Sequence, residues 1–445
     1  MRYAPHTEQD VREMLARTGA STIDELFSSI PVSVRLEGGL DLPAGVSEME
    51  TVERLRALAG RNRSADDLVC FAGAGAYDHY VPSAVWALAA RSELMTSYTP
   101  YQPELSQGVL QLLFEYQSMI CELTGMEVSN ASLYDGATAL VEAVNLARTA
   151  TGRHRVLVSG AVDDRFVKVL RAYGGGAGYE PEVFAVPEGT GGDPGVGANA
   201  GEDVAALIVQ HPNVYGALEP VRELFDTAHS AGARAIQIFD PLSLGVLAPP
   251  GELGADVAVA EGQSLGNHLN FGGPYLGVIA TRMQDVRKLP GRIVGETVDA
   301  DGKRGYVLTL QAREQHIRRE KATSNICTNQ TLMAIAATVY LAWLGPEGLR
   351  GLGERCAAKA RYAADRLTSV DGVSLLHPQA PFFKEFALRL PRSARDVRGA
   401  LVERGILAGV PLAQAGDDVL LVAVTERRTR AQIDAYVDAL AEILS

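Results

Sequence analysis

The sequence predicts an α/β fold, with a large domain built on a doubly wound, mainly parallel sheet and a smaller α+β domain at the C-terminus. Short, nearly continuous apolar runs alternate with amphipathic helical segments through the middle of the chain. Strands of this kind are buried on both faces of a parallel sheet. A long, nearly all-apolar helix follows at 329–345, and strands and helices then alternate again to the end. That helix separates the two predicted domains.

Composition is that of a folded globular protein. The chain has 445 residues, of which 47% are hydrophobic and 21% charged, and this excludes a mainly disordered or fibrous protein. The length suits two or three domains of roughly 100–200 residues. With 41 Lys and Arg against 54 Asp and Glu, the net charge is −13. Nucleic acid and anionic lipid are therefore disfavoured as partners.

Targeting and cysteine signals point to the cytoplasm. The first 15 residues are polar and lack the basic and then apolar regions of a signal peptide. No apolar run reaches the roughly 20 residues of a membrane span. We expect ordinary thiols and no metal site at the cysteines, which lack metal-ligand spacing. They are Cys70, Cys121, Cys327 and Cys356.

Residues 1–64 are predicted to form a helical arm. Apolar residues recur at helical spacing in 10–19, and Ser21 or Thr22 followed by acids is a capping pattern. A second amphipathic helix is expected to follow the N-cap residue Ser47.

Residues 65–322 are predicted to form the large domain. It opens with a Gly-rich, aromatic segment and a loop with two prolines, and a strong helix then ends at Gly125. A Gly-rich surface loop is expected at 188–203. The expected strands are 155–160, 182–187, 204–212, 235–240, 257–262 and 276–282. The expected helices are 134–150, 163–174 and 221–233.

Residues 323–445 are predicted to form a linking helix and the small C-terminal domain. The apolar helix is too short and too interrupted for a membrane, so we expect it to be buried. Two strands, 384–391 and 418–426, flank a helix at 395–405, and an amphipathic helix closes the chain.

Two local signals indicate a binding site at one edge of the large sheet. The turn at 134–139 opens a helix, and backbone N–H groups at a helix start bind phosphate; Asp135, Gly136 and Thr138 are the candidates there. A plain N-cap at Asp135 is the alternative. Asp240 ends one strand and His211 ends the preceding one, at the edge where ligands bind in doubly wound sheets. A strand-end cap and a packed loop histidine are the alternatives for these two residues.

The order of elements and these positions resemble the pyridoxal-phosphate (PLP) enzymes of fold type I. The resemblance implies an acid at Asp240 that keeps the ring nitrogen protonated, and a Schiff-base lysine after the next strand. The lysines are Lys168, Lys288, Lys303, Lys321, Lys359 and Lys384, and none lies at that turn. Counting back from Gly272 places Gln263 there, and glutamine cannot form an imine. The chain is therefore expected to perform no PLP chemistry alone.

Longer segments resemble a narrower family. FAGAGAYDHYVP, YTPYQPELSQG, AEGQSLGN, FGGPYLG and REQHIRREKATSNICTNQ, among others, span the sequence. Together they are similar to the alpha subunits of two-subunit glycine dehydrogenases (decarboxylating), the P-proteins of the glycine cleavage system. This resemblance implies an assembly of two alpha and two beta subunits, with PLP on the beta subunit. The implied reaction is decarboxylation of glycine, with transfer of the aminomethyl group to the lipoyl arm of H-protein.

The same resemblance implies that the loop at 98–104 faces the partner's PLP. Its two prolines fix the backbone, which suits presentation of Tyr98, Tyr101, Gln102 and Glu104. His79 is the general acid/base candidate nearby. The alternative interpretations are a packed interface loop and a structural histidine.

A polar segment before the long helix is a second interface candidate. Its residues are Arg318, Lys321, Ser324, Asn325 and Thr328, and a solvated charged face is the alternative. Two further hypotheses remain open for the whole chain. One is a non-catalytic scaffold that stabilises the beta subunit and docks H-protein; the other is a stand-alone PLP enzyme that uses Lys288 or Lys321.

Overall fold

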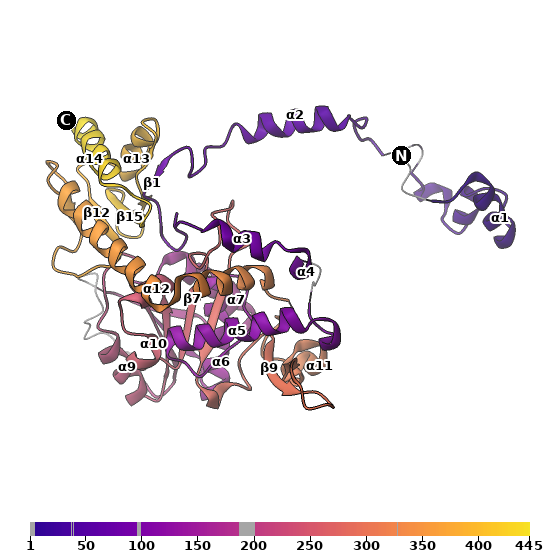
Figure 1. Cartoon of the computed structure of the whole chain (residues 1–445), viewed down its shortest axis with the longest axis horizontal. Helices are drawn as coiled ribbons and strands as arrows, with labels where there is room; N and C mark the ends of the chain where they lie inside the picture. The colour runs from indigo at the N-terminus through magenta and orange to yellow at the C-terminus, as the bar shows by residue number, and fades with distance from the viewer. Residues whose placement is uncertain (1–4, 37, 39, 96–98, 187–200, 327) are drawn as a thin grey trace. The chain divides into compact units, whose positions relative to one another are not determined.

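The computed structural model describes all residues except 1–4, 37, 39, 96–98, 187–200 and 327 (Figure 1). The chain folds as two compact units, Met1–Asn62 and Arg63–Ser445. Tyr98, Cys327 and most of the predicted surface loop at 188–203 lie outside the described residues.

The first unit contains short helices with strong caps. They are α1 (Glu8–Thr18), η1 (Asp24–Phe27), η2 (Val32–Val34) and α2 (Glu48–Ala59). Reciprocal capping boxes begin both longer helices, Thr7 with Asp10 and Ser47 with Glu50, because each pair satisfies two backbone N–H groups at the helix start. None of the described residues of this unit is buried, so its apolar side chains face outward from it.

A seven-stranded sheet forms the centre of the second unit. The strands, in spatial order, are β2 (Val128–Ser129), β8 (Gly277–Thr281), β7 (Val257–Glu261), β6 (Arg234–Phe239), β5 (Val204–His211), β3 (Arg155–Ser159) and β4 (Pro181–Phe184). The pairs from β7 to β4 are parallel, and β8 is antiparallel to both of its neighbours. The predicted doubly wound, mainly parallel sheet is confirmed.

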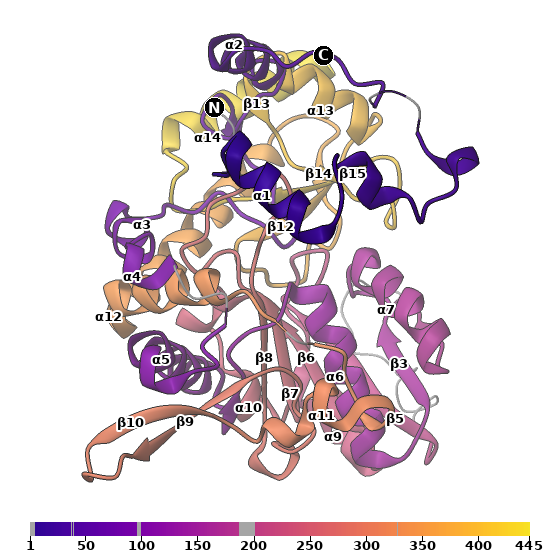
Figure 2. The same ribbon diagram turned by 90° about the vertical axis from the view of Figure 1, so that its right-hand side faces the viewer.

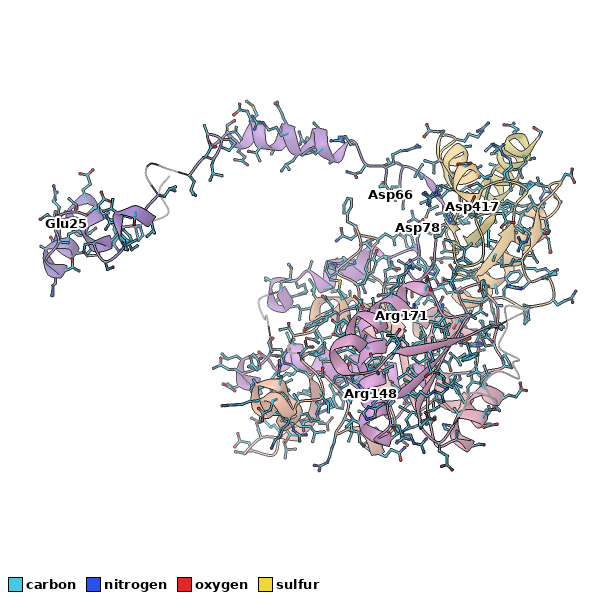
Figure 3. The ribbon with its side chains drawn as sticks, turned by 180° about the vertical axis from the view of Figure 1, so that it is seen from behind. Glu25, Asp66, Asp78, Arg148, Arg171 and Asp417 are labelled. Carbon is cyan, nitrogen blue, oxygen red and sulfur yellow. The ribbon has the colours of Figure 1, made fainter. Side chains whose placement is uncertain are left out.

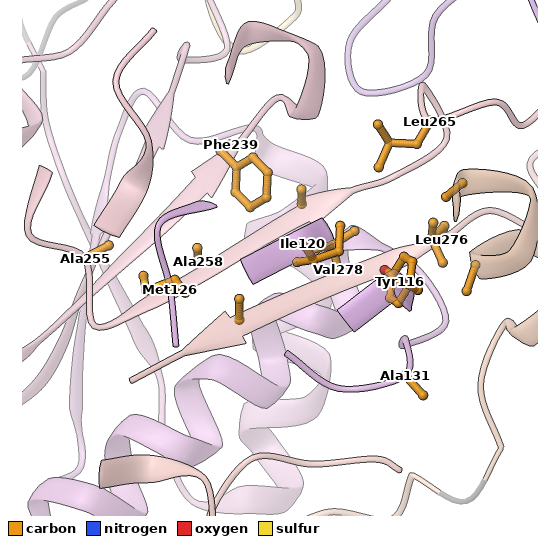
Figure 4. Close-up of a cluster of buried hydrophobic side chains, with 14 of the residues drawn as sticks. Tyr116, Ile120, Met126, Ala131, Phe239, Ala255, Ala258, Leu265, Leu276 and Val278 are labelled. Carbon is orange, nitrogen blue, oxygen red and sulfur yellow. The ribbon is translucent and has the colours of Figure 1, made fainter. Parts of the chain in front are cut away.

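Helices cover both faces of this sheet. One face carries α6 (Gly136–Thr151) and α7 (Asp164–Ala177), and the other carries α5 (Gln107–Thr124) and α9 (Val221–Ser230). In the hydrophobic core on the face that carries α5 and α9, Tyr116 and Ile120 of α5 lie against Val278 of β8 (Figure 4). Because the strands are buried on both faces, they appear in the sequence as continuous apolar runs.

Several shorter elements surround the sheet. They are α3 (Ser83–Ala89), α4 (Ser92–Met95), η3 (Pro103–Leu105), η4 (Pro241–Gly245), α10 (Pro250–Leu253), η5 (Met283–Asp285), η6 (Gln311–Arg313), α11 (Gln315–Arg318) and η7 (Arg319–Lys321). An antiparallel hairpin, β9 (Ile293–Val298) and β10 (Arg304–Thr309), extends beside them.

The long helix α12 (Thr331–Leu367) breaks at Gly345, whose φ of 59° and ψ of −180° are not helical. The helix packs on α3, α5 and η4. By length and composition it is long and apolar enough to cross a membrane, so the expectation that it is too short is wrong, and 44% of its most apolar window is buried. Core helices of soluble proteins meet the same criterion of length and composition.

The C-terminal part of the second unit, called the C-terminal domain below, contains a four-stranded antiparallel sheet with helices α13 (Ala394–Val402) and α14 (Arg430–Leu444). Its strands are β11 (Ser374–Leu375), β12 (Glu385–Arg389), β15 (Val419–Ala423) and β14 (Val410–Pro411). A separate short parallel pair joins β1 (Val69–Cys70) to β13 (Ile406–Leu407). Figure 2 shows β12 and β15 beyond one edge of the large sheet, and this edge carries the candidate site.

Candidate functional site

A buried pocket lies where the carboxyl ends of β5, β6 and β7 meet the start of β12. Its cavity measures about 50 Å³, which is room for roughly three or four waters. Both domains line it, with Asp240 and Glu261 from the large sheet and Lys384 and Glu385 from the C-terminal domain. The segment before α3 contributes Tyr77.

The centre of the pocket is the ammonium group of Lys384, whose residue is 1% exposed. Its Nζ lies 2.7 Å from Asp240 Oδ2 and 3.0 Å from His79 Nε2. The ring centroid of Tyr77 is 3.5 Å from the same Nζ. An ammonium group has three N–H donors, and a carboxylate, an imidazole nitrogen and an aromatic face therefore meet all three.

His79 is a neutral hydrogen-bond relay between Lys384 and Glu426. Burial, and then the charge of Lys384, lower the pKa of His79. Its Nδ1 lies 2.6 Å from Glu426 Oε2, so Nδ1–H donates to the carboxylate and Nε2 accepts from Lys384. Burial of Glu426 opposes ionisation, but hydrogen bonds from His79 and from the backbone N–H of Tyr80 outweigh it and lower the pKa to about 2. The predicted acid/base candidate thus has both nitrogens engaged.

A neighbouring thiol completes a group with metal-ligand chemistry. Cys356, His79 and Glu426 place one ligand atom each within 4.8 Å of one another. Lys384 already donates to the Nε2 of His79, and a cation placed here would be repelled by that ammonium. Burial raises the pKa of Cys356 to about 12, so its thiol stays protonated. The group is best described as a hydrogen-bonded cluster.

A second carboxyl group, Glu261, caps the N-terminus of α6. Its Oε2 accepts from Gly136 N at 3.0 Å, and its Oε1 accepts from Gln263 N and Leu276 N at 3.0 and 3.1 Å. Burial raises its pKa to about 7, and the backbone donors act in the opposite direction. The side chain of Asp135 accepts from Thr138 N at 2.8 Å, so Asp135 is the N-cap that the alternative interpretation predicted.

Gln263 holds the segment before α3 in place. The residue is 1% exposed, and its Oε1 accepts from Tyr77 N at 2.8 Å. Its Nε2 donates to the carbonyls of Tyr77 and Asn267 at 3.2 and 2.7 Å. An amide supplies both the donors and the acceptor that this site requires, whereas a lysine supplies donors only.

The same segment is tied to the C-terminal domain by charge. Asp78, labelled in Figure 3, accepts from Arg428 at 2.8 Å and also pairs with Arg427. Burial raises the pKa of Tyr77, so its hydroxyl stays protonated and donates to Glu385 Oε2 at 2.8 Å.

Among the described residues, Asp240 is the one predicted edge residue that lines the pocket, and His211 does not line it. Its Nδ1 accepts from Glu219 N at 3.0 Å. Burial lowers its pKa to about 4. His211 is therefore the packed, neutral loop histidine of the alternative interpretation.

The predicted loop lies elsewhere on the surface of the second unit. Tyr101, Gln102 and Glu104 are exposed. Arg292, only 2% exposed, donates from Nη2 to the Tyr101 hydroxyl at 2.6 Å and stacks its guanidinium 4.8 Å from that ring. The Nε and Nη1 of Arg292 have no acceptor among the described residues, which leaves donors beside the loop.

The polar segment before α12 divides between surface and interior. Arg318, Lys321 and Asn325 are exposed, and Thr328 is half-buried. Ser324 is half-buried and hydrogen-bonds to Glu142 of α6. Lys288 contacts Asp285 at 2.9 Å, away from the pocket.

Sequence reasoning missed most polar side chains of the pocket, among them Lys384 and Glu261. Glu261 could be recognised as a strand-end acid beside the Gly-rich turn. Lys384 gave no local signal, because its partner His79 is 305 residues away along the chain.

The parallel sheet with a helix start and an acid at its edge, joined to a small α+β domain, is the fold of the PLP-dependent fold-type-I enzymes. A solved sphingosine-1-phosphate lyase from Burkholderia pseudomallei shares this fold, with a TM-score of 0.64 at 15% identity, covering 93% of this chain and 94% of that one. The family model of the glycine cleavage system P-protein matches residues 1–440. The chain belongs to that family.

Relatives match over the whole chain. The probable glycine dehydrogenase (decarboxylating) subunit 1 of Moorella thermoacetica is 52% identical, and that of Chlorobium limicola 50%, each covering 100% of both sequences. A crystal structure of an inhibitor-bound glycine decarboxylase (P-protein) of the glycine cleavage system is 49% identical, with a TM-score of 0.92 and full coverage of both chains.

The pocket of this chain does not fit PLP. Gln263 offers no amine for an imine. The ammonium of Lys384 is already paired with Asp240, and the carboxyl group of Glu261 already accepts a hydrogen bond from the N-terminus of α6. No catalytic step is therefore assigned to a cofactor in this pocket.

Proposed function

We propose that this chain is the first subunit of a two-subunit glycine decarboxylase, and that it completes an active site whose PLP belongs to the second subunit. The observation that carries this proposal is the pocket of this chain. Gln263 stands at the position expected for the Schiff-base lysine, and Lys384 is paired with Asp240, the acid expected to hold the cofactor ring. The relatives named as subunit 1 of glycine dehydrogenase support the assignment.

The proposed reaction decarboxylates glycine and passes its aminomethyl group to the lipoyl arm of H-protein. The second subunit's cofactor would supply the electron-withdrawing chemistry. The contribution of this chain is to orient the glycine carboxylate or the lipoyl sulfur and to exclude water at the interface. The proposed assembly contains two copies of each subunit.

The loop that includes Tyr101 is suited to this role because it is fixed and polar. Pro100 is buried, and the side chain of Gln107 donates to the carbonyls of Pro103 and Tyr306 at 2.7 and 2.9 Å. The loop is thereby tied to β10 before any ligand binds, which lowers the cost of ordering it. Tyr98, next to it in sequence, is proposed to share the role.

Arg292 is the positioning residue of this loop. Its bond and its stacking place the Tyr101 hydroxyl, and its Nε and Nη1, which have no acceptor among the described residues, add positive potential. Such potential favours a bound carboxylate. Arg318 and Lys321 are proposed to meet acidic groups of the partner, with Asn325 and Thr328 beside them.

The compartment belongs to the proposal as well. The described cysteines, Cys70, Cys121 and Cys356, are free thiols, and free thiols are usual in reducing compartments. This supports a cytoplasmic location.

Loop substitutions in the co-purified two-subunit complex test the proposal. We expect Tyr101→Phe and Glu104→Gln to lower glycine-dependent exchange of labelled carbon dioxide by about 10-fold or more, because the first removes a hydroxyl group and the second a negative charge from the site. The matched control is Glu122→Gln, an exposed acid at the far end of α5, which should change exchange by less than twofold.

Complex formation, measured by sedimentation, separates the proposal from the scaffold alternative. On our proposal activity is lost in an intact complex. Activity that falls only in proportion to the amount of complex would favour the scaffold.

A further inference from the structure

We propose that the fold-type-I cofactor pocket of this chain is permanently filled by its own side chains, with the Lys384 ammonium in place of the protonated ring nitrogen and the Glu261 carboxyl group in place of the phosphate. The pocket is then an internal clamp that joins the large and C-terminal domains. This inference depends on the fold and on the contacts within the pocket, and it does not depend on the proposed reaction.

The first cofactor group that a side chain replaces is the protonated ring nitrogen. In this fold an acid at the end of β6 holds a cationic N–H of the cofactor ring. Asp240 occupies that position, and it receives a cationic N–H from Lys384 at 2.7 Å. The charge and the hydrogen bond that a protonated ring would supply are therefore both present. His79 Nε2 and the Tyr77 ring complete the surroundings of the ammonium group.

The second cofactor group that a side chain replaces is the phosphate, at the N-terminus of α6. An anion is favoured there because free backbone N–H groups and the helix dipole both point at it. Glu261 takes this place with hydrogen bonds from Gly136, Gln263 and Leu276. A Cβ on Gly136 would lie 2.7 Å from Glu261 N, so only glycine permits this approach of the strand end to the helix.

Little space remains in the pocket beside the side chains of Lys384 and Glu261. The cavity of about 50 Å³ holds a few waters, whereas a substituted pyridine ring with a phosphate needs several times more. Because Lys384 reaches Asp240 from the position just before β12, entry of a cofactor requires the C-terminal domain to give up a fully coordinated buried cation.

Restoring a cofactor site tests this inference. The variants are Gln263→Lys alone and the triple variant Gln263→Lys, Glu261→Ser, Lys384→Met. Each is incubated with PLP, reduced with borohydride, and this chain is weighed by intact-mass spectrometry in the co-purified complex. The single variant carries a potential imine-forming lysine but retains both internal groups. The label of the partner serves as the internal reference.

We expect at least threefold more label on the triple variant than on Gln263→Lys. A smaller difference, or a folded triple variant without label, overturns the inference. If the triple variant does not fold, the rates at which the lysines of the wild-type protein are acetylated test the inference instead. Lys384 should then react at least 10-fold more slowly than the exposed Lys303 in the native complex and equally in urea; equal native reactivity overturns the inference.

Discussion

At the scale of single residues, Lys384 shows how one buried cation fixes the character of a pocket. Its three N–H donors meet Asp240, His79 and the Tyr77 ring. A buried charge is tolerated only when its partners are complete. The identity of this pocket therefore depends on a lysine that comes from the other domain.

Lys384→Met should destabilise the chain by about 3–5 kcal/mol, because it leaves the carboxylate of Asp240 buried without its cation. The free energy of unfolding from urea denaturation, followed by circular dichroism, measures the effect. Lys303→Met is the control, since this exposed lysine should contribute less than about 0.5 kcal/mol. Equal stability of the two variants would contradict the buried clamp.

At the scale of elements, the start of α6 joins a helix terminus to a strand end through Glu261. Burial raises the pKa of this carboxyl group to about 7, above its value in an unfolded chain. The folded state therefore binds the proton more tightly. Its contribution to stability is complete below about pH 4.5 and is lost as the pH rises through 7.

Glu261→Gln should remove this part of the pH dependence. Between pH 5 and pH 8 the wild-type chain should lose roughly 2 kcal/mol more of its unfolding free energy than the variant does. Chemical denaturation at several pH values measures the difference. Glu142→Gln is a useful comparison, because burial raises the pKa of Glu142 to about 7 as well. Parallel pH curves for Glu261→Gln and wild type would show that Glu261 does not titrate in this range.

The hairpin of β9 and β10 is an element that sequence reasoning left unassigned. Its strands are partly exposed, and the turn contains Asp301 and Gly302, a pair typical of tight hairpin turns. The alternation of apolar and polar residues that predicts a strand is weak here, because part of this hairpin does not cover the core. It nevertheless supports the candidate loop, since Gln107 binds both Pro103 and Tyr306.

At the scale of the whole molecule, the apolar side chains of the first unit are not buried within that unit. Met49, Val52, Leu55 and Leu58 of α2 are exposed by 71, 37, 59 and 55%. An amphipathic helix is normally stabilised by covering its apolar face. The names of the relatives as subunit 1 indicate a second subunit, which is the occupant we expect.

Leu55→Asp together with Leu58→Asp should weaken association with the second subunit by 10-fold or more, measured as an apparent Kd by sedimentation. The fold of residues 63–445 should be retained, because that unit has its own cores. Arg54→Asp, an exposed substitution on the same helix, is the control and should have a small effect. Unchanged association of the double variant would exclude this helix face as an interface.

The sequence by itself determined the fold class, most strands and helices, the edge positions Asp240 and Gly136, and the absence of a lysine at Gln263. These features follow from local periodicity, capping residues and spacing. The tertiary structure decided what fills the pocket. Lys384 and His79 come together only because the C-terminal domain folds over the sheet edge. Pairings between such distant residues depend on the packing of whole domains, and no local pattern encodes them.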